Sequence, residues 1–194
     1  EDSASTCNSW SDLVTAGQCI LRMDVSLTQD SCDMYFTVDR YSAGTAIRGF
    51  GEAYSTLHAS SNNECGMPAI IVEDSATLEL SDLTLASGAN NADAGGIRTE
   101  VSAVVTVTRV VFRNHDGFMG AFYDEGTAAF YSSTFYDNAM VHVWARTSTT
   151  LYDCVFGDVY VYNDQWMTYD WTYGVAAVED GGTMTLVNCD FDGA

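Results

Sequence analysis

The sequence predicts an all-β protein whose parallel strands wind as a solenoid, and three observations support this fold class. Short apolar segments with alternating hydrophobic residues recur along residues 69–191. No segment shows the helical periodicity over about 10–12 residues that a crossover helix would need. The 16 glycines against a single proline indicate turns built from Gly, Asn, Asp and Ser. Successive parallel strands without crossover helices form a sheet only by winding around a common axis.

The composition is that of an acidic chain with enough apolar residues to form a core. Its 194 residues include 27 Asp and Glu, seven Arg and no Lys, which gives a formal net charge of -20. Such a charge repels phosphate, so we expect neither nucleic acid nor anionic membrane as a partner. Hydrophobic residues make up 47% of the chain, yet no apolar run reaches the ~18 residues of a membrane span.

The cysteines indicate an oxidising compartment. The six are Cys7, Cys19, Cys32, Cys65, Cys154 and Cys189. Their even number, without a CxxC or Cys/His zinc spacing, favours disulfides. The chain begins at Glu1 with neither Met nor an apolar leader, as a mature secreted form or an excised domain would. We therefore expect a secreted or cell-surface protein.

Five internal repeats carry the fold prediction. Each reads as a short apolar strand, a polar turn around a carboxylate, and an alternating strand that ends in Leu or Phe. The repeats are 69–85, 96–112, 120–135, 143–156 and 176–191. Their last residues form a terminal column of Leu85, Phe112, Phe135, Phe156 and Phe191. Leu83, Val110, Ser133, Cys154 and Cys189 stand two places earlier, on the same strand face.

These repeats resemble those of right-handed parallel β-helix proteins with a pectin-lyase-like architecture. FRNHDG and FYDNAM after the terminal Phe, with GG at 95–96 and GAF at 120–122, are similar to the FxxN and GGAI repeats of polymorphic outer-membrane proteins and related adhesins. The resemblance covers nearly the whole chain and is specific for fold rather than for function. It implies one domain, 1–194, with an N-terminal cap at 1–20, first coils at 21–68 and five repeat coils at 69–194.

The same resemblance predicts a short N-terminal capping helix. Its sequence is SWSDLV at 9–14, with Ser11 as N-cap. At the other end, no such segment follows Phe191. A solenoid needs its last coil covered, so we expect a protein partner or further coils to dock there, by assembly or oligomerisation.

The cysteine pairing stays open from the sequence. Cys154 and Cys189 share a column in consecutive repeats, at a spacing that a disulfide could bridge. The alternative is two buried thiols that pack as small hydrophobic side chains. Cys7 could pair with Cys19 or with Cys32, which would tie the cap to the first coil.

A column of carboxylates ends the first strand of each repeat. It comprises Glu73, Glu100, Asp124, Arg146 and Glu179. Stacked acids raise each other's pKa or bind a hard cation such as Ca2+, for which Glu73, Glu100 and Asp124 are the candidate ligands. Arg146 would pair with Asp124 or Glu179. The simpler interpretation is a solvated acidic turn face.

An aromatic insertion at 157–173 is the candidate ligand or interface site. Its aromatic residues are Tyr160, Tyr162, Trp166, Tyr169, Trp171 and Tyr173. Such a loop suits sugar stacking or a protein interface, or it folds back over the apolar side of the solenoid.

No catalytic residue is assigned. The polygalacturonase signatures and the Gly-x-Ser-x-Gly motif are absent, and we expect His115 in a turn to lie at the surface. The leading hypothesis is a structural or adhesive module, and the alternative is a carbohydrate-binding or carbohydrate-active one. A third hypothesis, ice binding, needs a regular Thr-x-Thr array. TVT, STT and TMT occur, but the sequence does not align them in one outward column.

Overall fold

The fold was described from a computed structural model. The structure describes residues 5–9, 11–12, 19–21, 25–28, 36–41, 44–51, 55–59, 68–90, 95–117, 120–139, 142–160, 176–179 and 181–191. In this part of the chain every element is a β-strand, and every strand pairing is parallel. The prediction of an all-β protein with parallel strands is therefore confirmed.

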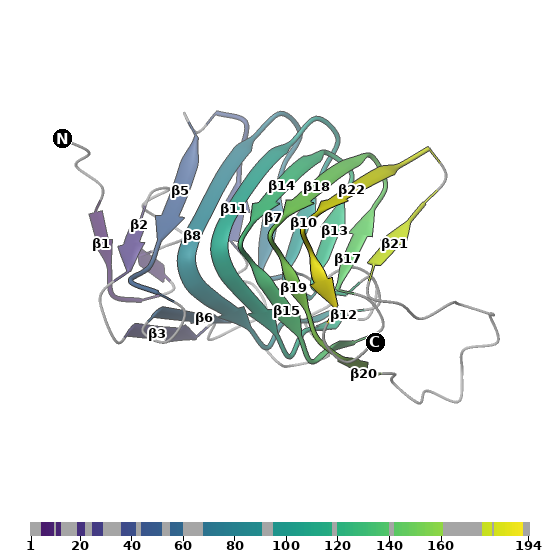
Figure 1. Ribbon diagram of the computed structural model, residues 1–194. Helices are drawn as coiled ribbons and strands as arrows, with labels where there is room; N and C mark the ends of the chain where they lie inside the picture. The colour runs from purple at the N-terminus through teal and green to yellow at the C-terminus, as the bar shows by residue number, and fades with distance from the viewer. Residues whose placement is uncertain are drawn as a thin grey trace.

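Two large sheets contain most of the strands (Figure 1). The 13-stranded sheet comprises β1 (Ser5–Cys7), β2 (Cys19–Leu21), β3 (Val25–Thr28), β5 (Thr45–Arg48), β6 (Ser55–His58), β8 (Thr77–Ala86), β11 (Val104–Arg113), β14 (Thr127–Tyr131), β15 (Thr134–Tyr136), β18 (Ser148–Tyr152), β19 (Val155–Phe156), β22 (Thr183–Val187) and β23 (Asp190–Phe191). The six-stranded sheet comprises β4 (Phe36–Val38), β7 (Ile70–Val72), β10 (Ile97–Thr99), β13 (Phe122–Asp124), β17 (Val143–Ala145) and β21 (Ala176–Val178). Two short pairs complete the structure: β9 (Ala89–Asn90) with β12 (Asp116–Gly117), and β16 (Asn138–Ala139) with β20 (Val159–Tyr160).

The chain alternates between the two large sheets. The order β4-β7-β10-β13-β17-β21 in one sheet runs beside β5-β8-β11-β14-β18-β22 in the other. Figure 1 shows this succession as a steady change of colour from purple to yellow. We call each passage through both sheets a row: row 1 is β7–β8, row 2 β10–β11, row 3 β13–β15, row 4 β17–β19 and row 5 β21–β23. Equivalent side chains of successive rows lie side by side.

The strand register confirms the terminal column. Its members pair in sequence across the rows, from Leu85 through Phe112, Phe135 and Phe156 to Phe191. The phenylalanine rings stack almost parallel, with centroids 4.9 Å apart for Phe112 and Phe135 and 5.2 Å apart for Phe135 and Phe156. Stacked rings of this size bury a large apolar area and contribute beyond that area.

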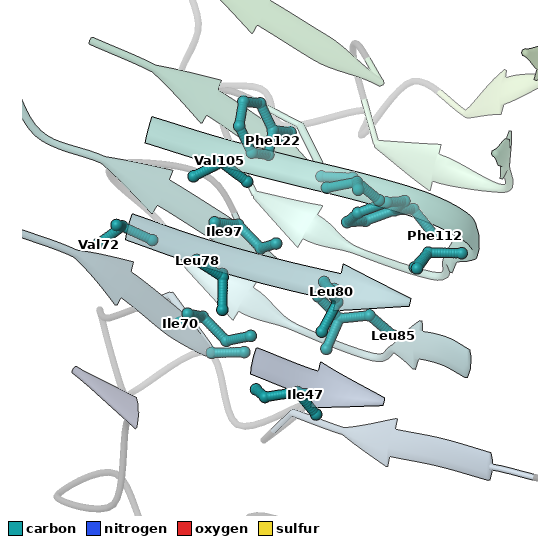
Figure 2. Close-up of a cluster of buried hydrophobic side chains, with 14 of the residues drawn as sticks. Ile47, Ile70, Val72, Leu78, Leu80, Leu85, Ile97, Val105, Phe112 and Phe122 are labelled. Atoms are coloured by element: carbon teal, nitrogen blue, oxygen red, sulfur yellow. The ribbon is translucent and has the colours of Figure 1, made fainter. Parts of the chain in front are cut away.

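The core lies between the two sheets. Ile70, Ile97 and Phe122 from the six-stranded sheet meet Leu78 and Val105 from the other sheet, as Figure 2 shows. The alternation in β8 and β11 explains this, because every second residue of a strand points to the same face. Leu78, Leu80, Val105 and Val107 are all buried.

A left-handed backbone position bends the long strands at one column. Asp82, Arg109, Ser132, Asp153 and Asn188 have φ values between 49° and 58°. Asn and Asp tolerate this conformation because their short polar side chains bond locally, whereas Arg is less suited to it. Arg109 is held by two hydrogen bonds to the Asp82 carboxylate, at 2.6 and 2.8 Å. The bend turns the terminal column toward the core.

Of the N-terminal capping helix expected at 9–14, only Ser11 and Asp12 have helical backbone in the described part of the chain, and no helix stands among its elements. Of 9–14 the structure describes Ser9, Ser11 and Asp12. There Asp12 N donates to Ser9 Oγ and Ser9 N donates to the Asp12 carboxylate, at 3.1 and 3.0 Å. Ser9, not Ser11, thus occupies the N-cap position of a reciprocal cap.

Candidate functional site

The strand register corrects the carboxylate column. Thr99 pairs with Asp124, and Val72 pairs with Thr99. The next residues therefore align, and the column is Glu73, Glu100, Glu125, Arg146 and Glu179. The sequence alignment places Asp124 in this column, one residue before Glu125. The reason is the length of the turn between the sheets, which has four residues in rows 1 and 2 (73–76 and 100–103) but two in row 3 (125–126).

Arg146 forms the predicted bridge to Glu179, at 3.1 Å, but its second acidic partner is Glu125, at 2.6 Å. Its guanidinium also donates to the Tyr123 hydroxyl at 3.2 Å. Those hydrogen bonds raise the pKa of Arg146, with the Glu179 charge adding to them. The column is therefore partly neutralised at rows 3 to 5. Glu73 and Glu100, in rows 1 and 2, are half-buried.

Asp124 itself lies inside the protein, fully buried. The Thr99 and Thr149 hydroxyls each donate to its carboxylate at 2.7 Å, and Gly126 N donates at 3.0 Å. Burial raises the pKa of Asp124, and the hydrogen bonds from Thr149, Thr99 and Gly126 partly oppose that shift. The side chain joins rows 2, 3 and 4 and is closed to a ligand. Nor do the described residues contain any group of three or more His, Cys, Asp or Glu placed to hold a metal ion.

His115 is buried, which corrects the expectation of a surface histidine. Its Nδ1 accepts from Gly88 N at 3.1 Å and its Nε2 donates to Leu85 O at 3.0 Å, so the Nε2–H tautomer is present. Burial lowers its pKa to about 4. Gly88 has no room for a side chain, because a Cβ there would lie 2.7 Å from His115 Nδ1.

Asn138 and His142 continue this buried polar cluster. Asn138 accepts from His115 N at 3.1 Å and donates to Phe112 O at 3.1 Å and to His142 Nδ1 at 2.9 Å. His142 Nε2 donates to Gly157 O at 2.8 Å, and burial lowers its pKa. Both rings use both nitrogens in structural hydrogen bonds. They hold the turns after the terminal column rather than offering a base.

The sequence carried a signal for this cluster. His115 follows Phe112 by three residues, as Asn138 follows Phe135. The pairing of Asp116 with Ala89 and of Arg113 with Tyr136 places Gly88, His115 and Asn138 in one column. His115 therefore takes the place of the Asn of the FxxN pattern.

The cysteines divide into one disulfide and one pair of thiols among the described residues. Cys7 and Cys19 are disulfide-bonded, with their Cα atoms 5.7 Å apart. Cys154 and Cys189 are free, the first buried and the second partly exposed. Cys32 and Cys65 lie outside the described residues.

The candidate aromatic insertion falls almost entirely outside the described residues. Tyr160 ends strand β20, whereas Tyr162, Trp166, Tyr169, Trp171 and Tyr173 are not described. Sugar stacking, a protein interface and a loop folded back over the solenoid therefore all remain hypotheses for this insertion.

An open groove crosses the outer face of β5, β8 and β11, which the sequence did not indicate. It has a volume of about 280 Å3. Its lining includes Arg48, Glu79, Ser81, Asp82, Thr108 and Arg109. Arg48 lies 3.8 Å from Glu79 across the groove. Two cations, two carboxylates and hydroxyl groups thus meet on one sheet face and offer both donors and acceptors.

Two tyrosines stand on the same sheet face in rows 3 and 4. Tyr131 is in register with Thr108 of the groove and with Tyr152 of the next strand. The two rings are parallel, with centroids 5.2 Å apart, and Tyr131 is 40% exposed. An exposed aromatic side chain therefore borders a polar groove.

The hydroxyl residues of this face align better than the sequence indicated. Thr77, Thr127, Ser148 and Thr183 share one outward column, and Thr106, Thr150 and Thr185 share the next. Val104 interrupts the first column, and Glu79 and Ala129 interrupt the second. The array is therefore regular only in its last two rows.

Row 5 differs from every other row in exposure. Val178, Leu186 and Phe191 are 50%, 42% and 40% exposed. Their equivalents in row 4, Ala145, Leu151 and Phe156, are fully buried. Among the described residues no strand pairs with the outer edge of β21, β22 or β23. Row 5 therefore displays an apolar face beside free strand edges.

Comparison with known proteins adds no relative. No protein-family model matches the chain, and no curated protein matches it. Within the described residues no helix is long and apolar enough to cross a bilayer.

Proposed function

We propose that the chain is a rigid right-handed β-helix of the secreted or cell-surface type, with a structural or adhesive role, which assembles through row 5. Support for the winding comes from the alternation between two parallel sheets and from columns that persist over five rows. A solenoid of this kind is stabilised by contacts between neighbouring rows. It therefore suits a spacer or an assembly module.

The exposed apolar face of row 5 carries the proposal. Leu186 and Phe191 continue columns that are buried in all four preceding rows. A free parallel strand edge is a template for another strand, and partly exposed Leu and Phe gain about 25 cal/mol per Å2 when covered. Burial of this face would complete the core as every earlier row does.

The occupant that we propose is row 5 of a second copy. Two such edges present the same strands and the same apolar columns, so they can form a self-complementary interface. The opposing force is charge, because each chain carries a net charge of -20. Association should therefore strengthen when salt screens the repulsion, at ionic strengths above ~0.15 M.

Size-exclusion chromatography with light scattering tests the assembly. The chain should shift from monomer toward dimer as concentration and salt rise. Leu186→Glu should remain monomeric, whereas Val101→Glu, a matched control at a 64% exposed position on row 2, should still associate. A chain that stays monomeric at high concentration and high salt contradicts the proposal, and so does equal association of both variants.

The Cys7–Cys19 disulfide supports the proposed location. Disulfides persist in secreted and cell-surface proteins and are rare in reducing compartments. Loss of folding in a reducing cytosol, with rescue by export, is the corresponding test.

Carbohydrate binding is the second candidate, and the groove at Arg48 and Arg109 favours it. Sugar hydroxyls are recognised by paired donors and acceptors, and sugar rings pack on aromatic faces such as Tyr131. A glycan array, run with and without EDTA, tests this function. Binding that Tyr131→Ala and Arg109→Ala both weaken would support it, whereas unchanged binding would remove the groove as the site.

A further inference from the structure

Cys154 and Cys189 are neighbours in space although 35 residues separate them. Phe156 pairs with Phe191, so the residues two places earlier, Cys154 and Cys189, also face one another. Asp190 N donates to Cys154 O at 2.9 Å, which places the two backbones in direct contact. Neighbouring strands lie ~4.8 Å apart, within the Cα separations that disulfides adopt.

Each of the two thiols donates to a backbone carbonyl of row 4. Cys154 Sγ donates to Tyr152 O at 3.3 Å, and Cys189 Sγ to Leu151 O at 3.5 Å. The Cys189 thiol therefore contacts row 4, the row of Cys154. Cys189 also packs against the buried core cluster.

Access to the two thiols is unequal. Cys154 is fully buried, whereas Cys189 is partly exposed on row 5. A reagent from solution can therefore reach Cys189, while Cys154 is closed to solvent and has Cys189 beside it. This is the arrangement of an attacking and a resolving cysteine.

We propose that Cys154 and Cys189 form a redox-active pair, which a disulfide oxidant closes into a cystine that fastens row 5 to row 4. The Cys189 thiolate attacks one sulfur of the oxidant and releases one thiolate, which leaves a mixed disulfide on Cys189. The Cys154 thiolate then attacks Cys189 Sγ and releases the second thiolate. The two cysteine protons pass through solvent to the two released thiolates, so two electrons and two protons convert the oxidant into two thiols.

The second step sets the rate of closure. Burial raises the pKa of the Cys154 thiol to about 11. Only a small fraction of Cys154 is ionised near neutral pH, so the rate of closure should rise about tenfold per pH unit below that value. The mixed disulfide on Cys189 should accumulate first.

The cystine should slow the local opening of row 5. It closes a long loop and removes conformations of the detached row that the dithiol form can adopt. Amide exchange in β22 and β23 should slow by on the order of a hundredfold. Exchange in row 2, at β11, should remain unchanged and serves as an internal control.

The experiment treats the full chain with oxidised glutathione in graded redox buffers. Digestion before aspartate gives the peptides 153–157 and 180–189, which mass spectrometry should find linked with the loss of two hydrogens. Cys154→Ser should stop at the glutathione adduct on Cys189. Cys189→Ser should leave Cys154 reduced.

Amide exchange of the oxidised and reduced chains completes the test. Linked peptides with slower exchange in β22 and β23 support the proposal. Two free thiols after oxidation, a stable glutathione adduct in the unsubstituted chain, or linkage without slower exchange would each overturn it. A monomeric chain would not affect this outcome, because the cystine joins two rows of the same molecule.

Discussion

Rows 3 and 5 have the same sequence pattern but differ in how completely they are buried. Phe135 in row 3 is fully buried between Phe112 and Phe156. Phe191 in row 5 is 40% exposed, and Phe156 is the one ring on which it stacks among the described residues. The difference shows that a residue in a stacked column gains its burial from both neighbouring rows. The strand pattern defines the column, and the neighbours supply the stability.

The largest difference in stability should appear when a phenylalanine ring is removed from row 3 in one variant and from row 5 in another. Phe135→Ala leaves a cavity within a closed stack and should lower the free energy of unfolding by about 3–5 kcal/mol. Phe191→Ala removes a ring that is already partly in water and should cost about 1–2 kcal/mol. Urea unfolding followed by circular dichroism measures both. Equal losses would contradict the unequal burial of the two rows.

Acid should weaken the inner rows through His115. Its pKa is about 4 in the folded chain against 6.5 for a free histidine. The unfolded chain therefore binds more protons between these values, and stability is lost as pH falls from about 6.5 to about 4. The loss should approach roughly 3 kcal/mol. His142 acts in the same direction, while the raised pKa of Asp124 acts against it.

Substitution of His115 separates its contribution from the others. Urea titrations across this pH range should show a shallower slope for His115→Asn than for the parent chain. His58→Asn is the control, because His58 is only half-buried and its pKa is lowered less deeply by burial and Arg113. An unchanged slope in His115→Asn would remove His115 as the cause.

Asp124 in row 3 and Val178 in row 5 occupy one column, so they also allow a buried position to be compared with an exposed one. Asp124→Ala leaves the Thr99 and Thr149 hydroxyls and Gly126 N without their acceptor, at a cost of about 2–3 kcal/mol. Val178→Ala, two rows on at a 50% exposed position, should cost at most about 1 kcal/mol. Thermal or urea unfolding compares them. A loss in Val178→Ala as large as in Asp124→Ala would argue against a structural role for the buried carboxylate.

Of the residues compared, Arg146 should contribute least to the stability of the protein. It links row 3 to row 5 through Glu125 and Glu179, but its guanidinium is exposed to solvent. Surface ion pairs are screened by salt. Arg146→Ala should therefore destabilise row 5 only at low salt, as measured by amide exchange in β21. A large effect that persists at high salt would show that the acidic column holds the last row in place.

The sequence predicted the columns because their spacing depends only on strand periodicity. The terminal column was correct at every position, including Cys154 and Cys189 two residues before it. Asp124 was misplaced by one residue, since the length of a turn does not show in the alternation of the strands. The prediction that His115 lies at the surface was wrong, because a polar residue after a strand is expected in a solvated turn. Its burial depends on backbone partners in the preceding row, Gly88 and Leu85, which the sequence pattern does not show.

The sequence also could not reveal the groove or the unequal burial of the rows. The groove joins Arg48 to Arg109, which lie in strands far apart along the chain. The αL position of Arg109, which directs its side chain to Asp82, has no signature in the residue type. Both features arise from the stacking of rows.

Amide hydrogen exchange at low and high protein concentration tests the central claim most directly. The account predicts slow exchange in β11 and β14 at every concentration, because neighbouring rows pair with both of their edges. It predicts fast exchange in β22 at low concentration and protection of β22 once the chain associates. Protection of β22 equal to that of β14 in the dilute monomer would contradict an open fifth row, and association that leaves β22 unprotected would contradict its role as the interface.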